Sequence, residues 1–361
     1  MDEMEPDEAA DLLGDMPSER AQRVLDGLED PDEVRPLLIH PDDSAGGLMT
    51  SEFLALRRRM TATDALQAIR DWKPDTETIY YLFVVDRFRH LCGVVSLRQL
   101  VVADPAVPLA EIMDTEVISV PAGTDQEECA RLMSRYDLLA LPVVDAGNTL
   151  LGVITIDDVV DVLEDEATED IQRLGGAEPL DRAYLNTGVL TVTRKRIGWL
   201  LLLFLTATLT GSVMRLFQNE LRAVVSLAVF VPLLIGTGGN AGSQTTATVI
   251  RALATGDVEL GDALRVWWHE ARIGLALGLG MALAAYLRAI TWESDPALAL
   301  TVSASILGIV LWATGTGALL PLLASKVGID PTVVSGPVMS TLVDATGLFI
   351  YFSIARLMLG L

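Results

Sequence analysis

The sequence predicts a multi-domain protein with a short helical N-terminal fragment, a tandem α/β module and an all-α domain of five transmembrane helices. From Met1 to Asp181 there are 14 Lys and Arg against 40 Asp and Glu, a net charge of −26, whereas Arg182 to Leu361 has 12 against 9, a net of +3. The mean hydropathy of +0.41 is high for a soluble protein, yet 21% of the residues are charged, which indicates two unlike parts. We expect domains at 1–48, 49–112, 113–172, 173–196 and 197–361.

The N-terminal fragment predicts two short helices, Pro6 to Leu13 and Ser18 to Leu28, with Ser18 as an N-cap. Asp7 and Asp11 are four residues apart on one helical face, where they could bind a divalent ion or form a solvated acidic face. The N-terminus has no signal-peptide pattern, so we expect the acidic half to be cytoplasmic. Its charge argues against a nucleic acid partner, because phosphate binding needs a basic surface.

An internal repeat occupies the rest of the acidic half. MTSEFLAL at 49–56 matches MDTEVISV at 113–120, and LCGVVSLRQLV at 91–101 matches LLGVITIDDVV at 150–160. Each copy predicts strand, helix, strand, turn, strand and helix. A repeat that recurs once indicates a paired module, whereas a solenoid would need several copies.

This repeat resembles a tandem of CBS modules, which implies a cleft for ATP or another adenine nucleotide. In the second copy the matching nucleotide residues are Thr155 and Asp158, preceded by Gly152, whereas the first copy has Gln99 in place of the acid. The alternative is a helix N-cap made by Thr155 with Asp157 and Asp158 in the first turn.

The segment that follows predicts two connecting helices. Asp157 to Asp170 is acidic with apolar residues at helical spacing, and Gly175-Gly176 ends it. A divalent cation would relieve the repulsion along such a face. A second helix is expected from about Asp181 to the basic cluster Arg194-Lys195-Arg196, where the membrane begins.

Hydrophobic stretches predict the membrane spans, at Ile197–Phe217, Ala223–Ile250, Ala271–Ile290, Ala297–Ser325 and Val333–Leu359. The basic cluster before the first span predicts a cytoplasmic N-terminus and, after an odd number of spans, a C-terminus outside. We therefore expect a multi-pass protein of the cell membrane.

Two polar interruptions of these spans predict an ion path. Asp344 is the only acid between Pro331 and Leu361, and a carboxylate at mid-membrane costs roughly 2.5 to 3.5 kcal/mol, so it should face a cation or water. The alternative is burial against a neighbouring helix. Gly236, Gly238, Gly239 and Gly242 disfavour a simple helix in the second span, so Asn240 and nearby carbonyls could line a cavity, or the glycines could form a packing surface. We expect Asp344 to be the only carboxylate inside the membrane-spanning helices.

Enzyme chemistry is not indicated. His269-Glu270 lacks a second histidine four residues later, where Ile273 stands, so it is not a zinc-protease motif. The histidines and cysteines form no metal-binding spacing, and no nucleophile and base pair stands out.

Several stretches together resemble the MgtE family of magnesium channels: PDDSAGGLMT (41–50), EATEDI (166–171), RKRIGWLLLL (194–203), PLLIGTGGNAGSQ (232–244) and LPLLASKVGIDPTVVSGPVMSTLVDATGLFIYF (320–352). The resemblance implies a homodimer in the lipid bilayer with a pore between subunits, lined by the second and fifth spans. It places the pore carboxylate at Asp344, with Ser340 and Gly336 one and two turns earlier.

The resemblance also implies regulation by bound Mg²⁺, through Asp7, Asp11, Asp157, Asp158, Glu178 and Asp181 and a plug helix at 173–196. Family members usually have a longer N-terminal domain, which implies weaker gating here. The expected function is Mg²⁺ transport through a gated dimeric channel. The alternatives are a divalent cation exporter or exchanger, and a membrane-anchored CBS sensor through which nothing crosses.

Overall fold

The computed structural model describes residues 4–14, 16–72, 80–180, 184–334 and 336–361. The chain divides into two compact units, Met1–Glu166 and Ala167–Leu361. The first is α/β and the second all-helical, as predicted.

The first unit begins with short helices that share a core with the second copy of the repeat. They are α1 (Pro6–Gly14), α2 (Ser18–Leu25), α3 (Pro31–Val34), the 3-10 helix η1 (Leu37–Ile39) and α4 (Ala45–Leu48). Leu13 and Leu37 pack in one cluster with Met133 and Val143, because the fragment is too small to bury its apolar side chains alone. The predicted N-cap at Ser18 is wrong: the carbonyl of Pro17 already accepts from the amides of Arg20 and Ala21, so the helix starts at Ser18.

The two copies of the repeat have the predicted order of elements. The first contains β1 (Ala55–Arg57), α5 (Ala62–Trp72), β2 (Tyr81–Val85), β3 (Leu91–Ser96), α6 (Leu97–Val102) and α7 (Leu109–Ile112). The second contains β4 (Val120–Pro121), α8 (Gln126–Tyr136), β5 (Ala140–Val144), β6 (Leu150–Thr155) and α9 (Ile156–Leu174). In each sheet the middle strand pairs parallel with the first strand and antiparallel with the third.

Each copy lends its opening segment to the other copy's sheet. Thr50 exchanges backbone hydrogen bonds of 2.9 and 3.1 Å with Val153, and Asp114 exchanges two of 2.9 Å with Val94. A Cβ at Gly152 would lie 2.6 Å from Met49 Cγ, and one at Gly93 would lie 2.7 Å from the sulfur of Met113. These glycines, which the sequence places next to the nucleotide motif, are therefore required by the crossing of the chain.

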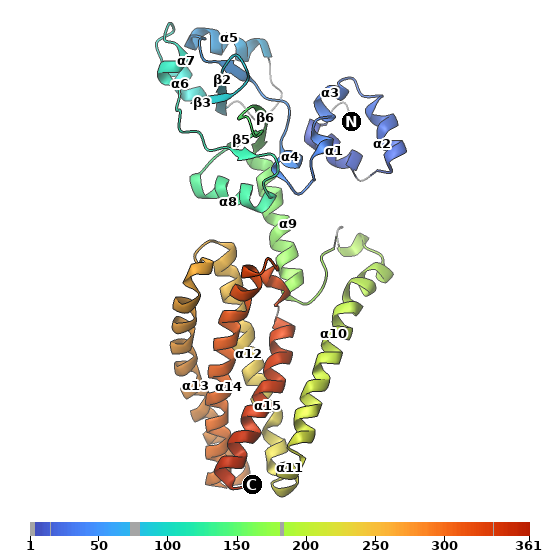
Figure 1. Ribbon diagram of the computed structural model, residues 1–361, viewed down its shortest axis with the longest axis vertical. Coiled ribbons are helices and arrows are strands. Elements are labelled where there is room, and N and C mark those ends of the chain that lie inside the picture. The colour runs from blue at the N-terminus through green and yellow to red at the C-terminus, as the bar shows by residue number, and fades with distance from the viewer. Residues whose placement is uncertain (1–3, 15, 73–79, 181–183, 335) are drawn as a thin grey trace. The chain divides into compact units, whose positions relative to one another are not determined.

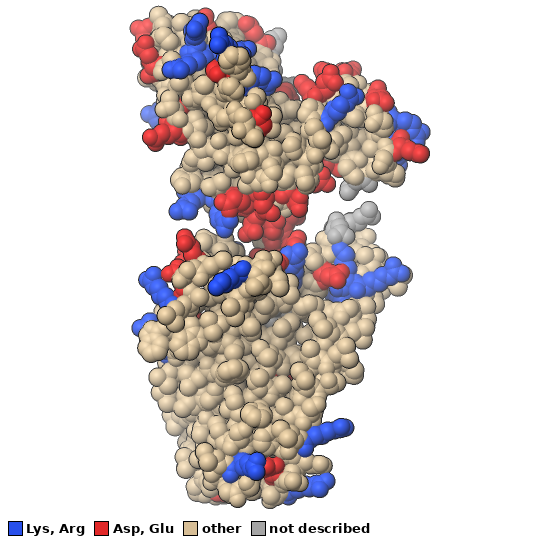
Figure 2. Space-filling model, in the orientation of Figure 1, with Lys and Arg blue, Asp and Glu red and all other residues tan. Residues whose placement is uncertain are grey.

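The second unit contains α10 (Val189–Leu216), α11 (Gln218–Ala223), α12 (Ser226–Ala254), α13 (Ala263–Glu293), α14 (Pro296–Lys326) and α15 (Gly336–Leu359), with the 3-10 helices η3 (Tyr184–Asn186), η4 (Leu260–Asp262) and η5 (Pro331–Val333). Five helices in the described residues are long and apolar enough to cross a membrane: α10, η4 with α13, α12, α14 and α15. Helices α12 to α15 form a bundle, and α10 runs beside α15 (Figure 1). The flanks of this unit carry few charges, which gather at its two ends (Figure 2).

Two helices differ from the sequence-based expectation. The basic cluster at 194–196 lies inside α10, which runs without a break from Val189 to Leu216, instead of ending a separate connecting helix. Helix α13 starts at Ala263, two turns before the predicted start of the third span at Ala271. Apolar periodicity marks where a helix enters an apolar environment, whereas the backbone hydrogen bonds can continue beyond that point.

The glycine-rich stretch of the second span is regular helix. Helix α12 is continuous, and a Cβ at Gly238 would lie 2.4 Å from Ile309 Cγ2, while one at Gly242 would lie 2.8 Å from Met339 Cε. The expectation of non-helical backbone here is wrong, because the missing Cβ atoms allow α14 and α15 to pack closely against α12. Gly236 faces open space, since a Cβ at that position would have no described neighbour within 4 Å.

Candidate ion path and cation-binding residues

The expected ion-binding residues form one stripe along α15. Gly336, Ser340 and Asp344 are spaced four residues apart, so they lie on one face of the helix, and each is partly exposed. Next to this stripe, Met339 and Val343, each one position before a member of the stripe, are fully buried in the bundle core. The buried face fixes the rotation of α15 and thereby the direction of the stripe.

Helix α12 contacts the beginning of this stripe. Ser243 Oγ donates to the carbonyl of Gly336 at 3.1 Å and lies 3.3 Å from Ser340 Oγ. Gly239 also faces Ser340, since a Cβ there would lie 3.3 Å from the hydroxyl oxygen. The structure therefore brings the second and fifth spans together at Ser340, and it adds Ser243, which sequence reasoning missed.

Asp344 itself has no partner among the described residues. Its side chain is half-buried, and no hydrogen bond or neighbouring charge acts on its carboxylate. Asn240 is exposed on α12, also with no side-chain hydrogen bond to a described residue. A half-buried carboxylate without a donor is costly in an apolar helix unless a cation or water reaches it.

A second carboxylate is buried in the bundle, contrary to the expectation that Asp344 is the sole membrane carboxylate. Glu270 on α13 is 8% exposed, and Thr245 Oγ1 of α12 donates to its Oε2 at 3.1 Å. The early start of α13 carries Glu270 into the bundle. Glu270 lies four residues before the buried Gly274, so both residues lie on the same face of α13. This helical spacing was the signal in the sequence that pointed to a buried Glu270.

The acidic residues predicted for regulation are partly brought together in the first unit. Asp7 is 6% exposed, accepts a hydrogen bond from the Thr50 side chain, and has one buried oxygen, Oδ1, with no described partner. Burial, with the charges of Glu5 and Asp11, raises the pKa of Asp7 to about 6. Asp11 itself is exposed, so the two acids do not form the shared face that their spacing predicts.

Asp158 at the start of α9 belongs to the same cluster. Burial raises its pKa to about 6, with further contributions from the charges of Asp7 and Asp157, while the Thr155 side chain opposes the rise. Burial and the charges of Asp158 and Asp157 also raise the pKa of Glu5. Within the described ranges no three metal-binding side chains converge on one point. The donors nevertheless suit Mg²⁺, which keeps most of its water and needs only one or two carboxylates.

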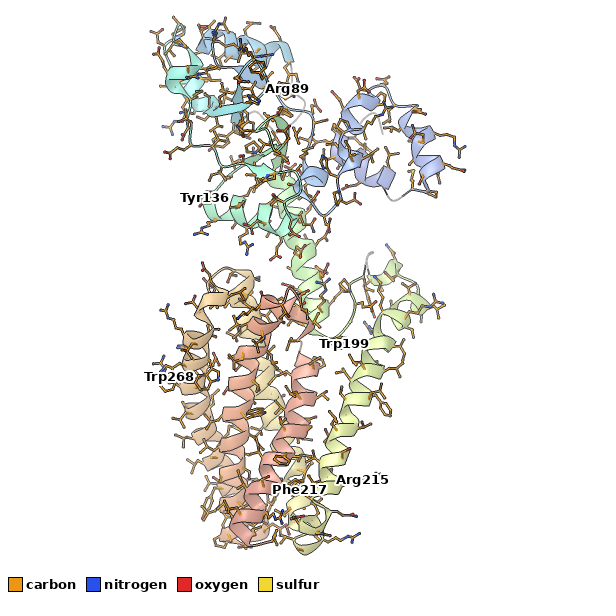
Figure 3. The ribbon with its side chains drawn as sticks, in the orientation of Figure 1. Arg89, Tyr136, Trp199, Arg215, Phe217 and Trp268 are labelled. Carbon is orange, nitrogen blue, oxygen red and sulfur yellow. The ribbon has the colours of Figure 1, made fainter. Side chains whose placement is uncertain are left out.

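The remaining regulatory residues lie in or beside the second unit. Glu178 is exposed, and its amide donates to the carbonyl of Lys195 at 3.2 Å, while Asp181 lies outside the described residues. Gly176 has a φ of +73°, and a Cβ there would lie 2.6 Å from Trp199 Nε1 and 3.2 Å from Pro337 Cγ. Trp199 is labelled on α10 in Figure 3. The end of α9 thus contacts both α10 and the start of α15.

Arg173 joins the same end of α9 to the loop before α15. Its guanidinium pairs with Glu169 and with Asp330, a residue 157 positions later in the chain. Burial and the charge of Asp330 raise the pKa of the nearby Asp170, and Arg173 opposes the rise. Sequence reasoning missed Arg173 and Asp330, since only the Glu169–Arg173 spacing of four residues was visible.

The predicted nucleotide residues carry out helix capping. Thr155 Oγ1 donates to Asp158 Oδ2, and the Thr155 amide donates to the same oxygen at 3.4 Å. Ser96 and Gln99 form the equivalent capping box in the first copy. Thr155 also lines a pocket with Tyr80, Tyr81, Ala140 and Asp157, and a neighbouring pocket of about 470 Å³ shares Tyr80, Tyr81 and Leu139 with it and adds Arg98. A cleft is thus present beside Thr155, although Asp158 does not line it.

Comparisons with known proteins match both units. The model of the MgtE family, described as divalent cation transporter, matches residues 231–354, and that of the CBS domain matches 45–105 and 109–165. The magnesium transporter MgtE of Thermus thermophilus is 47% identical over 327 residues, which cover 91% of this chain and 72% of that protein. The magnesium transporter MgtE of Bacillus subtilis is 34% identical over 357 residues, 98% of this chain and 79% of that protein.

Among solved structures, the cytosolic domain of the Mg²⁺ channel MgtE in complex with ATP is 47% identical. The match covers 44% of this chain and 66% of the chain in that structure, with a TM-score of 0.43.

Proposed function

Since the chain belongs to the MgtE family of divalent cation transporters, we propose that it carries Mg²⁺ across a membrane and that Asp344 binds the ion. The observation that carries this proposal is the half-buried carboxylate of Asp344, which no described residue neutralises in the predominantly apolar helix α15. Ser340 and Gly336 extend the stripe, and Asn240 is a further candidate on α12. Mg²⁺ loses water reluctantly, so hydroxyl and carbonyl oxygens would bind its hydration shell.

The ion path lies between two copies of the chain in a homodimer. Helix α10 supports this arrangement. None of its apolar 18-residue stretch is buried within the protomer, whereas 28% to 56% of the corresponding stretch is buried in the other four candidate spans. Lipid covers part of that surface, and a second copy would cover the rest. The cluster at 194–196 favours a cytoplasmic N-terminus and an external C-terminus.

Mg²⁺ also regulates the path through the first unit. Asp7 and Asp158 would bind the regulatory ion, with Asp157 nearby, because the unpaired Oδ1 of Asp7 and the raised pKa values of both acids indicate negative charge held without a counterion. Glu178 and Asp181 belong to the connecting segment at 173–196, the proposed plug. Asp11 is exposed and contributes to this site only through the effect of its charge on Asp7. In this proposal the N-terminal helical domain comprises residues 1–48, the two CBS modules comprise 49–112 and 113–172, and the transmembrane domain comprises 197–361.

An adenine nucleotide such as ATP binds the cleft beside Thr155. Tyr80 and Tyr81 offer aromatic surfaces for a base, and Arg98 offers a cation for phosphate. Asp158 would leave its capping contact to reach a ribose, so its contribution is smaller than that of Thr155.

Flux through liposomes tests the transport proposal. The purified full-length chain is reconstituted with a Mg²⁺-sensitive dye inside, and Mg²⁺ is varied on each side independently. Asp344→Asn should lower the initial flux at least about tenfold, the effect of losing one contact of about 1.4 kcal/mol. The control Asp257→Asn removes an exposed loop carboxylate and should leave the flux unchanged. Wild-type flux in the Asp344 variant would refute the assignment, and absence of flux in the wild type would favour the sensor alternative.

A further inference from the structure

A group of unpaired arginines lies on the first copy of the repeat, within the acidic half of the chain. Five of the 14 basic residues between Met1 and Asp181 are Arg57, Arg58, Arg59, Arg87 and Arg89. All five are exposed, and none forms an ion pair with an acid in the part of the chain that the structure describes. Basic side chains gather visibly on this copy (Figure 2), and Arg89 lies on its surface (Figure 3). Such clustering is unfavourable unless an anion relieves it.

Four of these arginines line a groove, and Arg89 follows in the same turn. A hollow of about 1080 Å³ is lined by Arg57, Arg58, Arg59 and Arg87 together with Phe88 and Pro108. The guanidinium of Arg87 lies 4.5 Å from the centre of the exposed Phe88 ring, which holds the turn residue in a defined position. The volume is comparable with that of sites for small ligands.

Among the described residues that line the groove, the one acid is Asp86, and its carboxylate is hydrogen-bonded within its own turn. Asp86 Oδ1 accepts from the amides of Phe88 and His90 at 2.7 and 3.0 Å, and Oδ2 lies 3.1 Å from His90 Nδ1. The Arg57 guanidinium donates to the Asp86 backbone carbonyl, at 3.2 Å, and not to its carboxylate. The carboxylate therefore shapes the turn and forms no ion pair with a described arginine, so four guanidinium groups share the groove with a single carboxylate.

The second copy of the repeat shows that the fold does not need these arginines. Sheet pairing makes Arg57 equivalent to Pro121, since they pair with Val85 and Val144 respectively. The same alignment makes Arg87, Phe88 and Arg89 equivalent to Ala146, Gly147 and Asn148, and Asp145 accepts from the turn amides as Asp86 does. Arg89 and Asn148 both have left-handed backbones, with φ of 68° and 63°. Asparagine suits that conformation better than arginine, so local structure does not explain Arg89.

We propose that this arginine groove binds a free oligophosphate, inorganic or carried by a nucleotide. Guanidinium groups bind phosphate through two parallel hydrogen bonds, and several adjacent arginines match the multiple charges of linked phosphates better than a single carboxylate. The groove lies at the end of the sheet where β2 finishes, whereas the cleft beside Thr155 lies where β2 and β5 begin. It is therefore a separate site from the cleft, and it does not depend on the transport proposal.

Calorimetric titration of the full-length chain with tripolyphosphate tests the proposal. Tripolyphosphate has no base, and metal-free buffer prevents Mg²⁺ from bridging. One equivalent should bind, and Arg87→Ala with Arg89→Asn, which installs the residues of the second copy, should weaken binding at least about tenfold. The matched control, Arg35→Ala with Arg131→Ala, removes the same charge from exposed residues paired with Asp32 and Glu128 and should change affinity less than about twofold.

Three results would overturn the assignment. The first is equal weakening by both double variants, which would indicate an effect of net charge alone. The second is undiminished binding to the groove variant, which would place tripolyphosphate elsewhere. The third is absence of tripolyphosphate binding while vesicles containing an anionic phospholipid bind through the groove, which would indicate a lipid surface.

Discussion

Replacing Asp7 by asparagine should stabilise α1 at neutral pH when divalent cations are absent. The pKa of Asp7 rises from 3.8 to about 6, mainly because the carboxyl is buried. A rise of about two units corresponds to roughly 3 kcal/mol of unfavourable free energy for the ionised form above pH 6. Asparagine has the shape of the neutral carboxyl and carries no charge, so it removes this cost.

The sign of the pH dependence follows from proton binding. Between the unfolded pKa near 3.8 and the folded value near 6, the folded chain binds more protons than the unfolded one. The stabilising contribution is therefore complete below about pH 4 and is lost as the pH rises through 6. The advantage of Asp7→Asn should be largest at pH 7.5 and fall below about 1 kcal/mol near pH 4.

Hydrogen exchange of the α1 amides measures this effect in the full-length chain. At pH 7.5 without divalent cations, exchange in the variant should be up to about a hundredfold slower than in the wild type at the same pH. Millimolar Mg²⁺ should slow exchange in the wild type and leave the variant unchanged. Asp26→Asn, at an exposed position of the same fragment, is the control. Faster exchange in the Asp7 variant, or an undiminished Mg²⁺ effect, would refute the reasoning.

Two further pairs of substitutions test the helix bundle. Gly238→Ala should lower the melting temperature and the Mg²⁺ flux, because the new methyl would lie 2.4 Å from Ile309 Cγ2. In the control Gly236→Ala the new methyl meets no described atom within 4 Å, so this variant should retain both the melting temperature and the flux. Similar melting temperatures of the two variants would contradict the packing of α12 described above. Glu270→Ala should lower the free energy of unfolding by about 1–3 kcal/mol, because it removes the acceptor of the Thr245 hydroxyl. Glu270→Gln keeps an acceptor oxygen and should recover most of this stability in a thermal-stability assay. Equal losses in the two variants would mean that the charge of Glu270 matters and the hydrogen bond does not.

The sequence is most informative where periodicity and repetition agree. The repeat predicts the order of strands and helices in both copies, and apolar stretches locate all the candidate spans, because both signals are local. The position of Asp344 within its span follows directly from its isolation among apolar residues. Its lack of a described partner needs the arrangement of the neighbouring helices.

The glycines of α12 illustrate what a single span does not reveal. Glycine lowers helix propensity, which favours a broken helix, but the close approach of Ile309 and Val343 outweighs that cost. These neighbours come from other helices, so the sequence of α12 alone leaves both interpretations open.

Long-range ion pairs are likewise invisible in one sequence. Asp330 meets Arg173 only after the bundle has formed, and nothing in the composition of either segment selects the other. By contrast, the cluster of Asp7 with Asp158 was expected from the family resemblance, and burial explains why its pKa values are raised.

The exchange of opening segments between the two copies has a consequence for synthesis on the ribosome. Thr50 finds its backbone partner, Val153, only after about a hundred further residues have been translated. The first sheet can form earlier, but the opening segment of the first copy and the N-terminal helices must wait with their apolar side chains uncovered. We expect nascent chains that stop before β6 to bind chaperones and to be sensitive to proteases. Release from the chaperone would then coincide with completion of the second copy, before the first membrane span emerges.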